Sequence, residues 1–163
     1  MTGRFLSLAV VAGLLAAPCT SWSYDEGLAE SYTKLFAPVQ GAAASKALHV
    51  MSVDAFVDAV KAGDSVMILD VRTPAEMAIF TAALPDSLTI PMNELFKRDN
   101  LARLPDGKKI VVLCATGARA IAAGTALRHV GFENVFILKG GFKALSEYLN
   151  PKTASAPVKP KAP

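Results

Sequence analysis

Two uninterrupted apolar runs of strand length, SVMILDV (65–71) and KKIVVLC (108–114), constrain the fold of this chain more than any other feature. A strand with one face in water alternates apolar and polar residues, whereas a strand of a parallel sheet is covered on both faces and is apolar throughout. Shorter apolar segments at 47–51, 88–91 and 134–138 are typical of further strands. Because strand and helix patterns alternate about five times, we expect one α/β domain, a parallel sheet of about five strands with helices on both faces.

The helix that follows the first apolar run has the clearest start signal in the chain. Thr73 is a capping residue, Pro74 suits the first helical position, and Glu76 stands three residues after the cap, which completes a capping box. An earlier helix is predicted to begin after the cap Ser52 and to end at Gly63. Further helices are predicted over 92–104 (one or two short ones), 118–131 and 140–149.

The N-terminus has the layout of a secretory signal peptide over residues 1–23. Arg4 is followed by an apolar core at 5–17 and by small and polar residues, with cleavage expected after Ser23. The alternative is an uncleaved signal anchor, but the apolar run is shorter than the ~20 residues that span a bilayer. A lipoprotein modified at Cys19 is disfavoured because a proline precedes that cysteine. We therefore expect an exported, periplasmic protein that contacts membrane only through this segment if it stays uncleaved.

The remaining organisation follows from composition. Residues 24–45 form an N-terminal extension, with a short amphipathic helix expected in 27–39 and a linker at 40–45. The folded domain is expected over 46–150. Residues 151–163 are rich in Pro, Ala and Lys without an apolar period, so a disordered tail is predicted there.

The formal net charge of +3 belongs to the ends of the chain. Setting aside Arg4, Lys152, Lys159 and Lys161 reduces the 17 basic side chains to 13, against 14 acidic ones. The domain itself therefore has no excess of positive charge, and we expect no nucleic-acid partner.

Cys114 is the only cysteine left once the signal peptide is removed. It cannot form an internal disulfide, so it is either a small buried apolar side chain or a functional thiol. The loop after it contains no bulky residue, and such a loop can curl until its N–H groups converge on one anion. The helix that follows and Arg119 add positive charge, which favours the nucleophilic thiolate. The candidate site is the nucleophile Cys114 with an anion cradle formed by Ala115, Thr116, Gly117, Ala118 and Arg119.

Other chemistries lack the residues they need. The chain has two histidines, His49 and His129, and neither stands beside the cysteine, which disfavours a Cys–His protease pair and a metal site. No GxGxxG or GxxxxGK[ST] pattern is present, so no nucleotide cofactor is implied. We expect neither a cofactor nor a metal.

Four segments in order resemble the rhodanese-like sulfurtransferase family over residues 46–149. Two of them look like the family patterns Asp-Val-Arg-x-Pro-x-Glu and Gly-Phe-x-x-Val-x-x-Leu-x-Gly-Gly. The four segments are LDVRTPAE (69–76), IPMNEL (90–95), VVLCATGARA (111–120) and GFENVFILKGGFKAL (131–145).

The resemblance implies a persulfide mechanism. Cys114 would take the sulfane sulfur of a small anionic donor such as thiosulfate and pass it to a thiol or to cyanide, while the amides of residues 115–119 and the Arg119 side chain hold the persulfide and the anion. A protein donor or acceptor is a further possibility. Asp70 and Arg72 resemble the family's Asp-x-Arg pair, which implies a supporting buried ion pair near the loop.

Loop length separates two branches of this resemblance. Related phosphatases have Cys-x5-Arg, whereas this chain has the sulfurtransferase spacing Cys-x4-Arg, and Leu113 stands where many of those phosphatases have histidine. A sulfurtransferase is therefore favoured over a phosphatase. The alternatives are a non-enzymatic module that carries sulfur or binds a partner, and an inert domain whose cysteine only packs.

The chain departs from the family pattern at four positions. Ala83 replaces a histidine, Asp86 a glycine, and Phe142 stands where tryptophan is common. Ala115 follows the cysteine where many members have arginine or another polar residue, so Arg119 is the only charge in the loop. A persulfide or protein donor therefore competes with thiosulfate as the expected donor.

Overall fold

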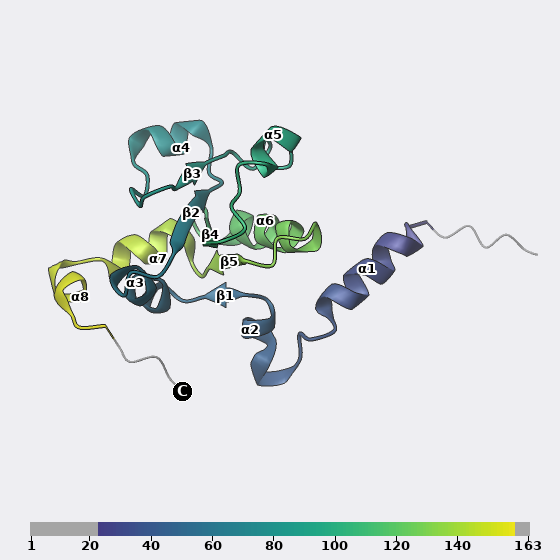
Figure 1. Ribbon diagram of the computed structural model, residues 1–163, viewed down its shortest axis with the longest axis horizontal. Coiled ribbons are helices and arrows are strands. Elements are labelled where there is room, and N and C mark those ends of the chain that lie inside the picture. The colour runs from purple at the N-terminus through teal and green to yellow at the C-terminus, as the bar shows by residue number, and fades with distance from the viewer. Residues whose placement is uncertain (1–22, 159–163) are drawn as a thin grey trace, which may run out of the picture.

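The computed structural model describes residues 23–158 (Figure 1). The predicted signal peptide, with Cys19, and the last five residues of the tail lie outside the described residues, except for Ser23 at the predicted cleavage site. Among the residues that the structure describes, every helix is too short or too polar to cross a bilayer.

Five parallel strands form one sheet in the order β1-β5-β4-β2-β3. The two apolar runs become the neighbouring strands β2 (Val66–Asp70) and β4 (Lys109–Leu113), and β4 pairs on its other side with β5 (Val135–Leu138). The edges are the two-residue strands β1 (Val50–Met51) and β3 (Leu88–Thr89). The predicted α/β fold with a five-stranded parallel sheet is confirmed.

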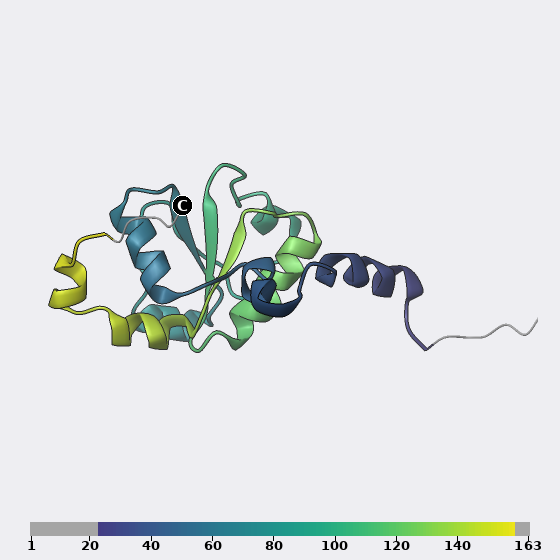
Figure 2. The same ribbon diagram turned by 90° about the horizontal axis from the view of Figure 1, so that it is seen from below.

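Helices cover both faces of the sheet (Figure 2). Helix α6 (Ala118–His129) packs on one face, while α3 (Val53–Lys61) and α7 (Gly141–Tyr148) lie together on the other. Alternate residues of β4 enter the two resulting cores: Val112 lies in the cluster under α6 and Leu113 in the cluster under α3 and α7. A strand with apolar contacts on both faces has no polar alternation, which explains the uninterrupted apolar runs.

Shorter helices fill the connections. The predicted capping box is present at α4 (Pro74–Ile79), where Thr73 Oγ1 accepts the Glu76 amide and Glu76 accepts the Thr73 amide. Helix α5 (Arg98–Leu101) is one turn within the predicted helical segment 92–104.

The segment before β1 differs from the predicted linker and strand. Residues Gly41–Ala43 form the short helix η1, Ala44–Ala47 form α2, and β1 begins only at Val50. Four of residues 42–47 are alanine, which has the highest helix propensity, and this local preference outweighs the short apolar pattern.

Both extensions contain a capped helix. The predicted amphipathic helix is α1 (Glu26–Phe36), which projects from the domain in Figures 1 and 2. In the tail predicted to be disordered, the structure has α8 (Pro151–Ser155), and Asn150 caps it by accepting the Thr153 amide at 3.0 Å. Lys61 Nζ also donates to the Thr153 carbonyl at 2.8 Å. Composition predicts disorder there because it carries no information about a single capping residue or about a contact with a distant lysine.

Candidate active site

Two strand ends place the candidate residues side by side. Asp70 and Leu113 are register partners at the carboxyl ends of β2 and β4. The Val71 amide then donates to the Leu113 carbonyl at 2.9 Å, so the pairing continues to the start of the cysteine loop. The Asp-Val-Arg turn and Cys114 therefore leave the same edge of the sheet, where parallel α/β folds bind ligands.

The Cys114 sulfur lies inside a curled loop. Its side chain is 1% exposed, and Sγ accepts the Gly117 amide at 3.1 Å and the Ala120 amide at 3.4 Å. Gly117 has φ 99°, a left-handed conformation that turns the loop into α6. The loop thus aims N–H groups and the positive end of a helix at the sulfur. Ala120 is a donor that the sequence did not predict, and it is placed there by the first turn of α6.

A second helix start supports the same loop from α7. The Phe142 amide donates to the Cys114 carbonyl at 2.7 Å, and the Lys143 amide donates to the Ala115 carbonyl at 3.0 Å. A Cβ on Gly141 would lie 2.3 Å from the Cys114 carbonyl oxygen, so only glycine allows this approach. From the sequence, this glycine is recognised only as part of a family pattern. The signal was a Gly-Gly pair directly after the last strand, at the edge that carries the cysteine.

The guanidinium of Arg119 is paired with the carboxylate of Glu76. Arg119 Nη1 and Nη2 donate to the two carboxylate oxygens at 2.8 and 2.7 Å, and each side chain is 34% exposed. The sequence predicted Arg119 as the positive charge of the anion cradle, and the structure also joins its guanidinium to the capping box of α4. The hydrogen bonds to Glu76 raise the pKa of Arg119, and the nearby Cys114 side chain makes a smaller contribution in the same direction.

The Glu76 carboxylate is stabilised in its charged form. Hydrogen bonds from Arg119 first, and then from the Thr73 amide and hydroxyl, hold the pKa of Glu76 far below its ordinary value of 4.5. A carboxyl group with a lowered folded-state pKa stabilises the fold above its unfolded-state value and loses that contribution as the pH falls through the folded-state pKa.

We expect Glu76→Gln to lower the free energy of unfolding at neutral pH, and the deficit against the unchanged protein to shrink as the pH falls below about 4.5. Denaturant unfolding at a series of pH values measures the free energy of unfolding and how the deficit changes with pH. Glu147→Gln, an exposed carboxyl on α7, is the control and should give a small difference that lacks this pH dependence. A deficit for Glu76→Gln that is the same at all pH values would contradict the assigned role of the ion pair.

Asp70 and Arg72 form a buried ion pair beside the loop. Arg72 Nη2 lies 2.7 Å from Asp70 Oδ2, Arg72 Nε donates to both carboxylate oxygens at 3.0 Å, and the two side chains are 3% and 1% exposed. Arg72 also donates to the Phe80 carbonyl at 2.7 Å, and its guanidinium carbon lies 4.3 Å from the Phe142 ring centre. The pair therefore joins the end of β2, the segment after α4 and the start of α7 around the cysteine loop.

A family model described as the rhodanese-like domain matches residues 52–148. The chain belongs to the rhodanese-like family. Its five-stranded parallel sheet matches the fold of a solved rhodanese-related structure.

Relatives of this rhodanese-like domain are distant in sequence. A sulfurtransferase of Allochromatium vinosum is 33% identical over 85 residues, which cover 52% of this chain and 76% of the relative. The mitochondrial thiosulfate sulfurtransferase RDL2 of Saccharomyces cerevisiae is 32% identical over 107 residues, 60% of this chain and 68% of that protein. A rhodanese-related protein of Thermoplasma volcanium has a similar crystal structure, with a TM-score of 0.51 and 28% identity over 61% of this chain and 91% of that one.

A cavity of about 300 Å³, the mouth of the candidate site, lies against Ala115 and Thr116 of the cysteine loop. The Thr116 and Ala118 side chains are exposed, while Gly117 is buried beneath them. Lys143 is exposed and makes no ion pair within residues 23–158, so its ammonium group is a free cation at the mouth. The lining includes Glu76, Ile79, Ala115, Thr116, Phe142 and Lys143.

The two histidines have structural contacts elsewhere in the rhodanese-like domain. His129 stacks on Tyr32 of α1 with ring centres 4.1 Å apart, and His49 Nδ1 lies 3.0 Å from the Val135 carbonyl oxygen. Across residues 23–158, no group of three or more His, Cys, Asp or Glu side chains is arranged to hold a metal ion.

Proposed function

We propose that the protein is a sulfurtransferase that moves a sulfane sulfur from thiosulfate or a persulfide donor to a thiol or cyanide. The observation that carries this proposal is the Cys114 sulfur with the Gly117 and Ala120 amides aimed at it. The membership in the rhodanese-like family and the relatives named as sulfurtransferases support it.

In the first step, the Cys114 thiolate attacks the outer sulfur of thiosulfate. A bond forms between Sγ and that sulfur, the sulfur–sulfur bond of thiosulfate breaks, and its electron pair leaves with sulfite. The positive end of α6 and the Gly117 and Ala120 amides favour the thiolate. The added sulfur lies about 2.05 Å from Sγ along the new bond.

In the second step, an acceptor thiolate or cyanide attacks the outer sulfur of the Cys114 persulfide. The sulfur–sulfur bond breaks and its electron pair returns to Sγ, which restores the starting thiolate. The loop amides stabilise the leaving thiolate, so they promote the step that completes the cycle.

The length of the cysteine loop supports sulfur transfer over phosphate chemistry. The related phosphatases have five residues between the cysteine and the arginine, whereas this chain has four.

Mass spectrometry of the intact protein tests the proposal. After incubation with thiosulfate, we expect a gain of one sulfur atom in the unchanged protein and none in Cys114→Ser, with addition of cyanide releasing thiocyanate and restoring the original mass. A persulfide that forms without turnover would favour the sulfur-carrier alternative. No sulfur uptake from thiosulfate or from a glutathione persulfide would contradict both functions.

We further propose that the protein is exported, with residues 1–23 removed as a signal peptide. N-terminal sequencing of protein recovered from the periplasm of an expressing bacterium should begin at Tyr24. Retention of the full-length chain in the cytoplasmic fraction would contradict this location.

A further inference from the structure

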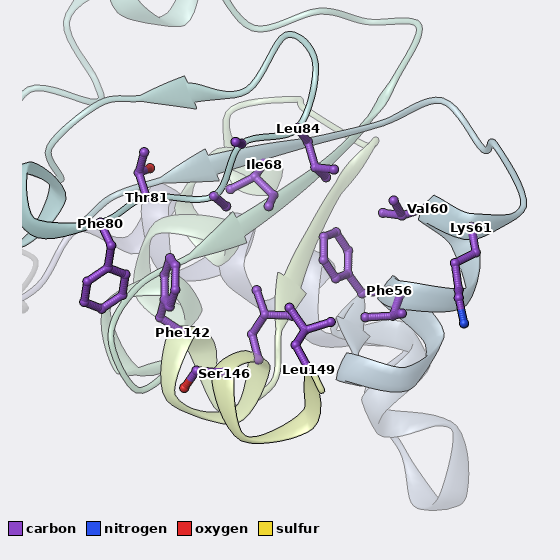
Figure 3. Close-up of a pocket in the computed structure, with 14 residues that line it drawn as sticks. Phe56, Val60, Lys61, Ile68, Phe80, Thr81, Leu84, Phe142, Ser146 and Leu149 are labelled. Atoms are coloured by element: carbon purple, nitrogen blue, oxygen red, sulfur yellow. The ribbon is translucent and has the colours of Figure 1, made fainter. Parts of the chain in front are cut away.

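A second, larger cavity of about 560 Å³ adjoins the mouth of the site. Figure 3 shows it between α3, α7 and the segment at 80–84 that follows α4. Its size falls within the roughly 300–1,000 Å³ typical of small-molecule sites. Apolar residues of these three segments, of the residue that follows α7 and of β2 line it, including Phe56, Val60, Ile68, Leu84, Leu145 and Leu149.

The larger cavity and the mouth share part of their walls. Phe80, Phe142 and Ser146 line both spaces, and the two aromatic rings meet edge to face with their centres 4.7 Å apart. Phe80 is 53% exposed, so its ring is not fixed in the core. A molecule in the larger cavity would therefore contact the same rings that line the mouth.

The lining of the larger cavity is mostly apolar, and Lys61 is its charged residue. Lys61 Nζ donates to the Thr153 and Ala156 carbonyls of the C-terminal segment. The mouth also carries an exposed ammonium group, that of Lys143. The two adjoining spaces thus match a molecule with a thiolate at one end and an uncharged apolar body at the other.

We propose that the sulfur acceptor is a low-molecular-weight thiol with an alkyl or aromatic body, and that this body occupies the larger cavity. The proposal rests on the proposed sulfurtransferase function. The acceptor sulfur reaches past Phe80 and Phe142 to attack the outer sulfur of the Cys114 persulfide, and the acceptor leaves as its own persulfide. Burial of the body holds the thiolate next to its target, which raises the effective concentration of the reacting pair.

The test uses protein loaded with persulfide and a series of straight-chain alkanethiols. We expect the second-order rate of persulfide loss to rise by up to about fourfold for each added methylene until the cavity is full. Cysteine and mercaptoethanol, which have no apolar body, should react most slowly. A rate that does not depend on chain length, in protein that does form the persulfide, would overturn the acceptor assignment and leave the sulfurtransferase function intact. Absence of the persulfide would contradict the sulfurtransferase function instead.

Variants that fill the cavity test the location. In Ala82→Phe, a ring added to a partly buried lining residue should remove the chain-length dependence while persulfide formation from thiosulfate is unchanged. Ala122→Phe, at an exposed position of α6, is the matched control and should retain the dependence. Leu149→Trp on the opposite wall provides a second filling variant if Ala82→Phe does not fold.

Calorimetric titration with the methyl thioether of octanethiol measures binding without sulfur transfer. We expect saturable binding to the unchanged protein and to Ala122→Phe, and none to a filled variant. Equal binding to the filled and control variants would place the apolar body elsewhere and overturn the proposal.

Discussion

Replacing Gly141 by alanine is expected to destabilise the protein and to abolish sulfur uptake. The new Cβ would lie 2.3 Å from the Cys114 carbonyl oxygen and 2.8 Å from the Gly117 amide nitrogen, and all of these atoms belong to the backbone. Gly141 also has φ 60°, where alanine is strained. Left-handed strain of about 1–2 kcal/mol and overpacking of about 1–3 kcal/mol together lower the free energy of unfolding by roughly 2–5 kcal/mol.

Gly63→Ala is the matched control for that variant. Gly63 has φ 73°, and a Cβ added there meets no atom within 4 Å. It should therefore show only the strain of about 1–2 kcal/mol and take up sulfur at the unchanged rate. Denaturant unfolding measures the free energy of unfolding, and intact mass after thiosulfate treatment measures sulfur uptake. Equal behaviour of the two alanine variants would mean that contact between α7 and the cysteine loop is not what requires glycine.

Arg72→Met is expected to be the most destabilising change to a side chain. It removes the partner of Asp70 and leaves a carboxylate that is 1% exposed without its counter-charge. Breaking a buried pair in this way costs about 3–5 kcal/mol, since the remaining charge keeps its desolvation penalty. The loss of the hydrogen bond to the Phe80 carbonyl also frees the segment that borders both cavities.

The double variant Asp70→Leu with Arg72→Met separates the unpaired charge from the lost packing. We expect it to be more stable than Arg72→Met alone, because no charge is then left buried. Urea unfolding of the two single variants and the double variant completes the cycle. Additive losses in the double variant would show that the two residues act independently, contrary to the pair described above.

The features predicted well from the sequence are those fixed by neighbours along the chain. The buried strands β2 and β4 follow from apolar runs, and the start of α4 follows from Thr73, Pro74 and Glu76 within one turn. The curled loop after Cys114 follows from its small residues and its place between a strand and a helix. Each of these depends on short-range sterics and hydrogen bonds, which a local pattern can report.

The features that the sequence did not predict depend on distant residues. Glu76 was recognised as a helix cap, but its pairing with Arg119 joins residues 43 positions apart. The contact of Gly141 with the cysteine loop likewise requires the strand order of the sheet. The large cavity is set by how α3, α7 and the segment after α4 pack, and no local pattern contains that information.

The support that α7 gives to the cysteine loop also sets the order in which the site can be completed during synthesis. Cys114 leaves the ribosome before Gly141, Phe142 and Lys143, whose backbone holds the loop in place. A nascent chain that ends after β4 therefore has the thiol but lacks the backbone donors that support its loop. The reactive centre is assembled only after the last strand has been made, so a prematurely terminated product would carry the cysteine without a finished site.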